Sequence, residues 1–373
     1  MKVRGEYRLL IAGGKTGGHL FPGIAVAKKF LSLGQNRKVL FVGTKEGLEA
    51  KVLPRENLDV KFVTSVGIRG KGIIGVLKAI LLLPLTLFQS FQILLSYKPD
   101  AALGVGGFAS GPVILIASLL RIPTAIQEQN VTPGITNKIL GKVVDRVFVS
   151  FSQSAQYFPS KKVMVTGNPV REEIVNQAVG ESELRKDLLE PGKVTVLVFG
   201  GSQGARAINR AIVDFLRANP TFRDKINLIH QTGTADYQWV HDEYAQMGFK
   251  AIVMSFIYKM AEAYSAADIV ICRAGAGTVF ELLAAGKASV LIPYPYAAGD
   301  HQTYNAMVLA EKGAAVMVRQ SEIEKGMLSR TLKELIADRE RLKIMGEKAR
   351  AIAKPDAGEV IARQLEELAQ KDD

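Results

Sequence analysis

The chain has 373 residues, a formal net charge of +12 and one cysteine, Cys272. A hydrophobic content of 48% excludes intrinsic disorder, and a single cysteine excludes an intrachain disulfide or a cysteine-rich metal site. Residues 1–168 hold 22 Lys or Arg and 8 Asp or Glu, a balance of +14, against −2 for the rest. The basic residues do not form a cluster typical of nucleic-acid binding. We therefore expect no nucleic-acid partner, but an anionic membrane surface or a phosphorylated substrate.

Short apolar runs typical of β-strands alternate with helical patterns along the whole chain. In the first half they lie at 8–12, 39–42, 101–103, 124–127, 146–149 and 162–166. After Pro191 the pattern restarts, at 194–199, 226–230, 251–254, 269–272 and 289–292. Near-continuous apolar character is typical of parallel strands covered on both faces, so the alternation predicts doubly wound α/β sheets.

Each half begins with the same plan, a strand followed by a glycine-rich turn and a helix. We therefore predict two Rossmann-like domains, 1–168 and 169–354, with a linker near 167–176. Further helical patterns run from about 283 onward, over 329–354 and over 355–370. We expect the C-terminal segment, about 355–373, to pack back on the first domain.

Two stretches without charged residues, 79–97 and 101–120, approach the length of a membrane-spanning helix. Pro84 interrupts the first, and four glycines and Pro112 interrupt the second, so we expect neither to span a bilayer. Apolar residues over 73–85 recur at helical spacing, bordered by Arg69, Lys71 and Lys78. This pattern fits a core helix and an apolar patch on an anionic membrane equally well.

Three glycine-rich turns follow strand-like runs and lead into helical patterns: 13–19 (GGKTGGH), 200–204 (GGSQG) and 273–278 (RAGAGT). Glycines let a backbone approach a ligand closely, and the N–H groups at a helix start bind anions. None of the three is a dinucleotide or Walker fingerprint, and any one alone could be only a tight turn. Their matching places in two domains favour a phosphate-bearing ligand outside the carboxyl ends of the strands.

Six segments together resemble the MurG family of bacterial glycosyltransferases: GGKTGGHLFPGIAVA, GVGGFASGP, QEQNVTPGITNKIL, GNPVR, GGSQGARAIN and CRAGAGTVFELLAAGKASVLIPYPYAAGDHQTYNA. The resemblance runs in order from about residue 8 to about residue 310. It implies a GT-B fold, in which two Rossmann-like domains face each other across a cleft, with the donor UDP-GlcNAc on the C-terminal domain. It also implies inverting transfer of GlcNAc to the MurNAc 4-hydroxyl of lipid I, which gives lipid II and UDP.

The same resemblance implies an enzyme without a cofactor or metal, bound peripherally at the cytoplasmic face of the inner membrane. Its implied partners are UDP-GlcNAc, lipid I, the anionic membrane surface and other proteins of cell-wall synthesis. The chain departs from the family at two places. Lys15 stands where glycine is frequent, and His301-Gln302-Thr303 replaces a version with two glutamines.

Three titratable residues in the matched motifs are candidates for the chemistry. His19 suits a general base at the acceptor hydroxyl, because its pKa lies near neutrality, but it could also only cap the helix. Glu128 is a second acid/base candidate and could equally be a structural hydrogen-bond acceptor. The resemblance implies that Glu281 binds the ribose hydroxyls of UDP. Its spacing from Thr278 also fits a helix capping box.

The remaining candidates would bind substrate. Thr16, Gly17, Gly18 and Ser202 sit at predicted helix starts and can offer donors to phosphate or sugar oxygens. The resemblance implies that Arg171 contacts the donor, that Ile257 recognises uracil through its backbone, and that Asn130 and Gln302 bond to GlcNAc. It extends the donor site over Ala276, Gly277, Thr278, Val279 and Phe280. It places a loop with Gly104, Gly106, Gly107 and Ser110 against the lipid I pyrophosphate.

Two other interpretations stay open. The chain could be another GT-B enzyme that uses a UDP-sugar, such as a diacylglycerol glucosyltransferase or a UDP-GlcNAc 2-epimerase. It could also be a peripheral membrane scaffold without catalytic activity. An epimerase would not need the apolar and basic N-terminal region, and a scaffold would not need the matched donor residues.

Overall fold

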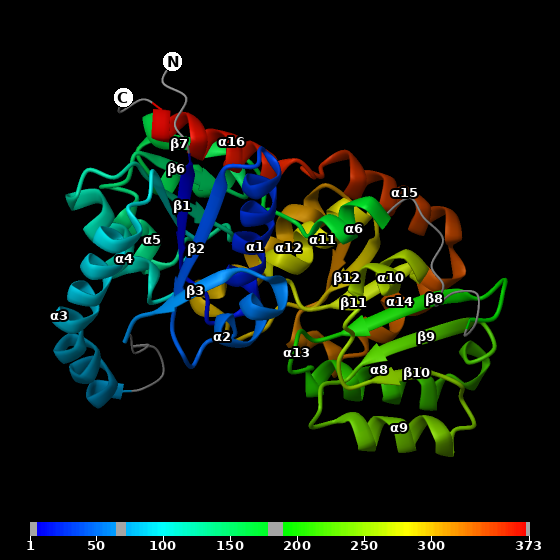
Figure 1. Cartoon of the computed structure of the whole chain (residues 1–373). Coiled ribbons are helices and arrows are strands. Elements are labelled where there is room, and N and C mark those ends of the chain that lie inside the picture. Colours follow the sequence, from blue (N-terminus) through cyan, green and yellow to red (C-terminus); the bar gives the residue numbers. More distant parts are fainter. Residues whose placement is uncertain (1–5, 65–71, 178–188, 371–373) are drawn as a thin grey trace. The chain divides into compact units, whose positions relative to one another are not determined.

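The computed structural model describes residues 6–64, 72–177 and 189–370, with the side chains of 72–79 and 177 left out. The chain forms two compact units (Figure 1). Unit 1 comprises residues 1–171 and 355–373, and unit 2 comprises 172–354. The division therefore falls three residues later in the chain than the expected boundary at 168, and the expected linker region contains α6 (Glu172–Gln177).

Unit 1 contains one parallel sheet of seven strands in the order β3-β2-β1-β4-β5-β6-β7. The strands are β1 (Tyr7–Ala12), β2 (Arg37–Gly43), β3 (Asp59–Phe62), β4 (Ala101–Gly104), β5 (Thr124–Glu128), β6 (Arg146–Val149) and β7 (Val163–Val165). The helices are α1 (Gly17–Ser32), α2 (Glu49–Val52), α3 (Gly72–Tyr97), α4 (Ser110–Leu119), α5 (Ile135–Leu140) and α16 (Ala357–Gln370).

Both faces of the first sheet are covered, which explains why its strands are apolar throughout. Leu9 and Ile11 of β1 point into a core shared with α1 and α16, whereas Leu10 and Ala12 point into a core shared with α3, α4 and α5. Helices α1 and α16 lie side by side (Figure 1), and Arg37 pairs with Glu366 at 2.7 Å. The C-terminal helix is thus part of unit 1.

Helix α3 runs without a break from Gly72 to Tyr97, so Pro84 does not interrupt it as expected. Proline removes one helical hydrogen bond, but burial of Ile93 and Leu94 against the sheet stabilises the helix beyond it. Among the described residues, α3 is the one helix long and apolar enough to cross a membrane by length and composition alone. The second charge-free stretch, 101–120, is divided between β4 and α4.

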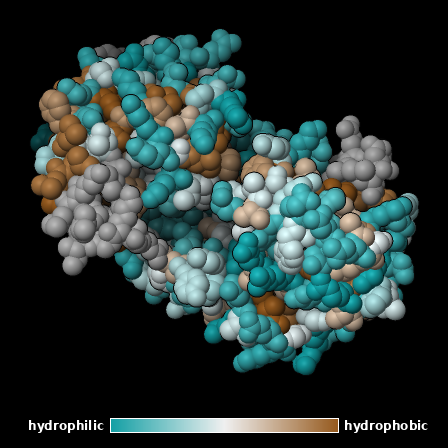
Figure 2. All heavy atoms as spheres, turned by 90° about the horizontal axis from the view of Figure 1, so that it is seen from below, coloured by the Kyte–Doolittle hydropathy of each residue, from teal (hydrophilic) through white to brown (hydrophobic). Residues whose placement is uncertain are grey.

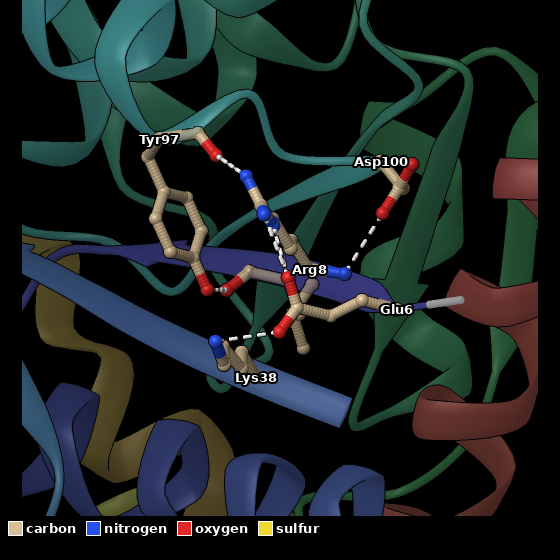
Figure 3. Close-up of polar contacts among 6 residues, drawn as sticks. Glu6, Arg8, Lys38, Tyr97 and Asp100 are labelled. Carbon is tan, nitrogen blue, oxygen red and sulfur yellow. Dashed lines mark hydrogen bonds and ion pairs between the residues drawn. The ribbon is translucent and has the colours of Figure 1, made fainter. Parts of the chain in front are cut away.

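A polar cluster fastens the C-terminal end of α3 to the first two strands (Figure 3). The Arg8 guanidinium donates to the Tyr97 carbonyl at 3.0 Å, and the Arg8 backbone N–H donates to Asp100 Oδ2 at 2.8 Å. Glu6 forms ion pairs of 2.6 Å with both Arg8 and Lys38. Burial raises the pKa of Tyr97 above its usual value, so this phenol stays neutral.

Unit 2 contains a parallel sheet of six strands in the order β10-β9-β8-β11-β12-β13. The strands are β8 (Val194–Phe199), β9 (Ile226–Gln231), β10 (Ile252–Met254), β11 (Ile269–Cys272), β12 (Ala288–Leu291) and β13 (Ala315–Met317). Besides α6, the helices are α8 (Arg206–Ala218), α9 (Tyr237–Gln246), α10 (Met260–Ala266), α11 (Ala276–Ala285), α12 (His301–Glu311), α13 (Gln320–Ile323), α14 (Met327–Ala337) and α15 (Arg339–Ala351).

The second sheet is also covered on both faces. Val196 and Val198 point into a core with α8, α9 and α14, whereas Phe199 meets Tyr264 of α10 edge to face at 6.1 Å. The expected single helix over 329–354 is instead two helices, because Asp338 adopts a non-helical conformation and caps α15 through Arg341 N. The helical pattern from 283 onward is the end of α11.

Candidate functional site

The turn after β1 and the loop after β4 lie against each other at the carboxyl edge of the first sheet. Gly14 N donates to Gly106 O at 3.3 Å, and a Cβ on Gly13 would lie 2.2 Å from that same carbonyl. Gly13 and Gly106 both have positive φ, 137° and 92°. A side chain on Gly13 would therefore force the two loops apart.

We call this contact between the two loops the glycine junction, and the His19 ring packs against it. A Cβ on Gly106 would lie 2.9 Å from the His19 ring, and His19 Nδ1 is 3.4 Å from Thr16 Oγ1. Thr16 is the N-cap residue of α1, and Gly17 and Gly18 are its first two helical residues. The ring is half-buried, while Thr16 and Gly18 are exposed. The structure thus brings a titratable ring and a helix start together at one edge of the sheet.

The second glycine segment is less open than the motif indicated. Gly104 is the last residue of β4 and Ser110 the first of α4, so the loop itself is only 105–109. Ser110 is fully buried, and a Cβ on Gly104 would lie 2.6 Å from its Oγ. The Ser110 hydroxyl is therefore not accessible from the surface of the loop. Gly107, which contacts the first turn, remains accessible to one.

Glu128 is 2% exposed, and both of its carboxylate oxygens accept hydrogen bonds. Oε1 accepts from Asn130 N at 2.9 Å, and Oε2 accepts from Asn137 Nδ2 at 2.8 Å and Gly134 N at 3.3 Å. Burial raises the pKa of Glu128, and these hydrogen bonds oppose the shift. This geometry fits the structural alternative for Glu128 better than a role in proton transfer. Asn130 is half-buried on the loop that Glu128 holds.

Arg171 is the last residue of unit 1 before α6. Its guanidinium carbon lies 4.9 Å from the centre of the Phe21 ring, a cation–π contact with α1. Phe21 in turn is the side chain that a Cβ on Gly17 would meet at 2.9 Å. Arg171 is therefore held close to the first turn of α1 within unit 1.

The glycine turn after β8 differs from the expectation in one respect. Ser202 is exposed and lies four residues before α8, whose N-cap is Ala205, so it is not at a helix start. The turn is anchored by the neighbouring loop after β9. Gly204 has φ +73°, and a Cβ there would lie 1.9 Å from Thr232 O.

Helix α11 begins at the carboxyl end of β11, with Gly275 as its N-cap. Thr278 is therefore its third residue, and the capping box that was the alternative role for Glu281 does not form. The first helical hydrogen bond runs from Val279 N to Gly275 O at 2.9 Å, which leaves the N–H groups of Ala276, Gly277 and Thr278 before it. The side chains of Val279 and Phe280 are buried in the core, so only their backbone could meet a ligand.

Glu281 is half-buried and accepts a hydrogen bond from Tyr264 OH at 3.1 Å. Ile257 follows β10 with its side chain buried, between the exposed and mutually packed rings of Phe256 and Tyr258. Gln302 lies at the start of α12, where its Oε1 accepts from Tyr294 N at 2.9 Å. Its amide NH₂ points away from this contact, because the oxygen faces the loop.

Arg273 was in a matched motif but was not among the expected site residues. Its NH1 donates to the carbonyls of Ile292 and Pro293, and its NH2 donates to Gln320 Oε1 at 2.7 Å. Burial lowers the pKa of Arg273. The sequence feature that could have indicated Arg273 is its position directly after the apolar run 269–272, at the start of a glycine-rich turn. Among the described residues, no group of three His, Cys, Asp or Glu side chains could hold a metal ion.

Comparison with known proteins identifies the family of the chain. Residues 9–149 match the glycosyltransferase family 28 N-terminal domain, and residues 195–361 match the family 28 C-terminal domain. A Myxococcus xanthus protein named UDP-N-acetylglucosamine–N-acetylmuramyl-(pentapeptide) pyrophosphoryl-undecaprenol N-acetylglucosamine transferase is 46% identical, over 95% of this chain and 91% of its own. A Thermodesulfovibrio yellowstonii relative with the same name is 44% identical, over 97% and 98%.

Solved structures agree with this placement. The crystal structure of Acinetobacter baumannii MurG has a TM-score of 0.77 and 32% identity, over 97% of this chain and 99% of its own. A UDP-GlcNAc 2-epimerase from Neisseria meningitidis has a TM-score of 0.67 over 97% and 100%, but at 13% identity it shares only the fold. The chain belongs to glycosyltransferase family 28, with the GT-B fold, and within that family to the MurG enzymes.

Proposed function

We propose that this enzyme transfers GlcNAc from UDP-GlcNAc to the MurNAc 4-hydroxyl of lipid I, giving lipid II and UDP with inversion. The observation that carries the proposal is the near full-length similarity to relatives named for this reaction. The new bond joins the acceptor oxygen to C1 of GlcNAc, and the bond from C1 to the diphosphate breaks. The hydroxyl proton passes to a base, and the electron pair of the broken bond stays on UDP.

The donor would lie at the carboxyl edge of the sheet of unit 2. The N–H groups at the start of α11 and the exposed Ser202 can donate to the diphosphate and stabilise its charge as it departs. Glu281, steadied by Tyr264, can accept from the ribose hydroxyls. The Ile257 backbone would meet the uracil. Arg171, Asn130 and the NH₂ of Gln302 are the proposed further contacts with the donor.

In unit 1 we assign the acceptor to the glycine junction below His19, with Thr16, Gly17, Gly18, Gly106 and Gly107 around it. A half-buried imidazole can take the acceptor proton near neutral pH. The 3.4 Å contact with Thr16 Oγ1 orients the ring. We propose His19 as the base and Glu128 as the support of the loop that carries Asn130.

Transfer of labelled GlcNAc to a lipid I analogue tests the proposal directly. We expect His19→Ala to lower kcat by a factor of about 100 or more and to leave the affinity for UDP unchanged. We expect Glu281→Ala to weaken UDP-GlcNAc binding about tenfold, with Tyr264→Phe as a milder control. Epimerisation of UDP-GlcNAc without acceptor, or no transfer at all, would overturn the assignment.

We further propose that unit 1 binds peripherally to the cytoplasmic face of an anionic membrane. The apolar surface consists of side chains on α3, α4 and α5 that are 57 to 79% exposed: Ile80, Leu81, Phe88, Leu119, Ile135 and Ile139. Figure 2 shows such hydrophobic side chains gathered at the left of the view. Exposed cations accompany them, namely Arg121, Lys138 and Lys142. Arg69 and Lys71 lie outside the described residues.

Vesicles that contain phosphatidylglycerol test this location. Leu81→Glu with Ile139→Glu should abolish sedimentation with vesicles, whereas Ile344→Glu on unit 2 should not. High salt should weaken vesicle binding more than UDP binding, because surface charges are screened at about 10 Å in 0.1 M salt. Equal sensitivity of both would contradict this division of roles. Other proteins of cell-wall synthesis remain proposed partners.

A further inference from the structure

Glu49 has no place in any matched motif, yet it lies beneath the first glycine turn. Its side chain is 1% exposed. Oε1 accepts from Thr44 N at 2.8 Å and from Thr44 Oγ1 at 3.0 Å, and Oε2 accepts from Lys15 N at 2.6 Å. No ion pair to Glu49 occurs among the described residues. This buried carboxylate is therefore satisfied by hydrogen bonds, one of which comes from a turn 34 residues earlier in the chain.

We infer that Glu49 is a positioning residue for the transfer reaction, because it fixes the glycine turn that carries His19. The inference rests on the proposed acceptor site. Lys15 has φ +74°, a left-handed conformation that is unfavourable for a residue with a Cβ. The hydrogen bond from its N–H to Glu49 holds it there.

The contact is close enough to set the path of the turn. A Cβ on Gly14 would lie 2.6 Å from Glu49 Oε2, so the carboxylate fills the space beside this glycine. Thr16 follows Lys15 directly, occupies the N-cap position of α1 and contacts His19. A shift of Lys15 would therefore move the cap and the ring with it. The contact of Glu49 with the turn is made to the backbone N–H of Lys15, and the buried Glu49 side chain itself does not touch substrate.

The variant Glu49→Gln tests this chain of contacts with almost no change in volume. An amide has one acceptor oxygen and one NH₂ donor group. If its oxygen faces Thr44, it keeps two hydrogen bonds and turns its NH₂ against Lys15 N–H. The reverse orientation keeps the bond from Lys15 N–H and can donate to Thr44 Oγ1, but it leaves the buried Thr44 N–H without an acceptor. That loss costs more than losing the acceptor of the part-buried Lys15 N–H. Glu49→Gln should therefore break the contact with the turn and keep the contact with Thr44.

Two control variants separate positioning from general stability. Thr44→Val removes the hydroxyl bond at the other end of the same carboxylate and leaves the Lys15 contact intact. Asp145→Asn neutralises a carboxylate that accepts from Thr124 N and Oγ1 at 2.8 and 3.0 Å, at the opposite edge of the sheet. Neither residue belongs to the proposed machinery, so both variants should keep at least half of the wild-type kcat.

The measurements are turnover with a lipid I analogue, UDP affinity by calorimetry, and amide hydrogen exchange over residues 13–19. Glu49→Gln should lower kcat by a factor of 10 to 100, leave UDP affinity within twofold, and speed exchange in this segment. Near wild-type kcat in Glu49→Gln, or an equal loss in Thr44→Val, would overturn the inference. If Glu49→Gln does not fold, wild-type exchange decides, since an unprotected Lys15 amide would refute the contact. Absence of wild-type transfer would instead refute the proposed function.

Discussion

His230 predicts a specific loss of stability of unit 2 in acid. The ring is fully buried on β9, with Nε2 3.0 Å from Asn209 Oδ1 and Nδ1 2.8 Å from Tyr244 OH. Asn209 uses its NH₂ to donate to Thr232 O and Asp236 Oδ2, both at 2.9 Å. Its Oδ1 must then accept from a protonated Nε2. The Tyr244 hydroxyl donates to the bare Nδ1, so this network requires the neutral ring.

The size of the effect follows from the shift in pKa. Burial lowers the pKa of His230 from 6.5 to about 3, although the nearby Asp236 favours the charged form. The unfolded chain therefore takes up a proton below pH 6.5 that the folded protein excludes. The contribution to stability is complete above pH 6.5 and is lost as the pH falls toward 3. At pH 5 the loss is about 2 kcal/mol, since each pH unit is worth about 1.36 kcal/mol.

Trp239 provides the assay, because it is the one tryptophan of the chain and lies on α9 of unit 2. Urea unfolding followed by its fluorescence should give a free energy of unfolding about 2 kcal/mol lower at pH 5 than at pH 7. His230→Gln cannot take up this proton and should lack that part of the pH dependence, whatever its stability at pH 7. Parallel curves for wild type and variant would refute the reasoning.

Three further predictions concern packing and burial. Leu365→Ala in α16 should cost unit 1 about 2–5 kcal/mol in chemical denaturation, whereas the exposed Glu367→Ala should change it by less than about 0.5 kcal/mol. Burial raises the pKa of the Cys272 thiol, so Ellman's reagent should react with it only after denaturation, and rapid native labelling would contradict this. Glu128→Ala should lower Tm by several degrees, because it leaves the buried NH₂ of Asn137 with one acceptor fewer, and an unchanged Tm would argue against the structural role.

The sequence predicts every interior strand of both sheets and two of the four edge strands, β7 and β10. The eleven expected runs all contain strands, because strands covered on both faces are apolar throughout. The two strands without a matching expectation, β3 and β13, are each the last of their sheet. Strand β3 alternates exposed and half-buried residues, and β13 has only three residues. Strand β3 therefore leaves no apolar run, whereas β13 lies within the apolar run 314–318, which the expectation did not include.

Rules for helix boundaries that use only neighbouring residues failed where contacts between distant parts of the chain determine the structure. A proline does not end α3, because its far end is packed on the sheet and fastened by the polar cluster of Arg8 and Tyr97. The spacing of Thr278 and Glu281 fits a capping box, but the helix begins earlier, at Ala276. The resemblance identified the residues at the sheet edges. It did not indicate Glu49, whose partners lie 5 and 34 residues away and share no motif with it.

The two units hold their first glycine turns by different means. In unit 1 the turn rests on one carboxylate, that of Glu49, which bonds directly to its backbone. In unit 2 the turn packs on Thr232, and the Thr232 carbonyl accepts from Asn209, which bonds to His230. The second support contains His230, whose pKa burial lowers to about 3, so acid destabilises this part of unit 2 through proton uptake by the unfolded chain. The protection factors of amide exchange over 200–205 should therefore fall from pH 7 to pH 5 in the wild type more than in His230→Gln, and an equal fall in both proteins would contradict this link.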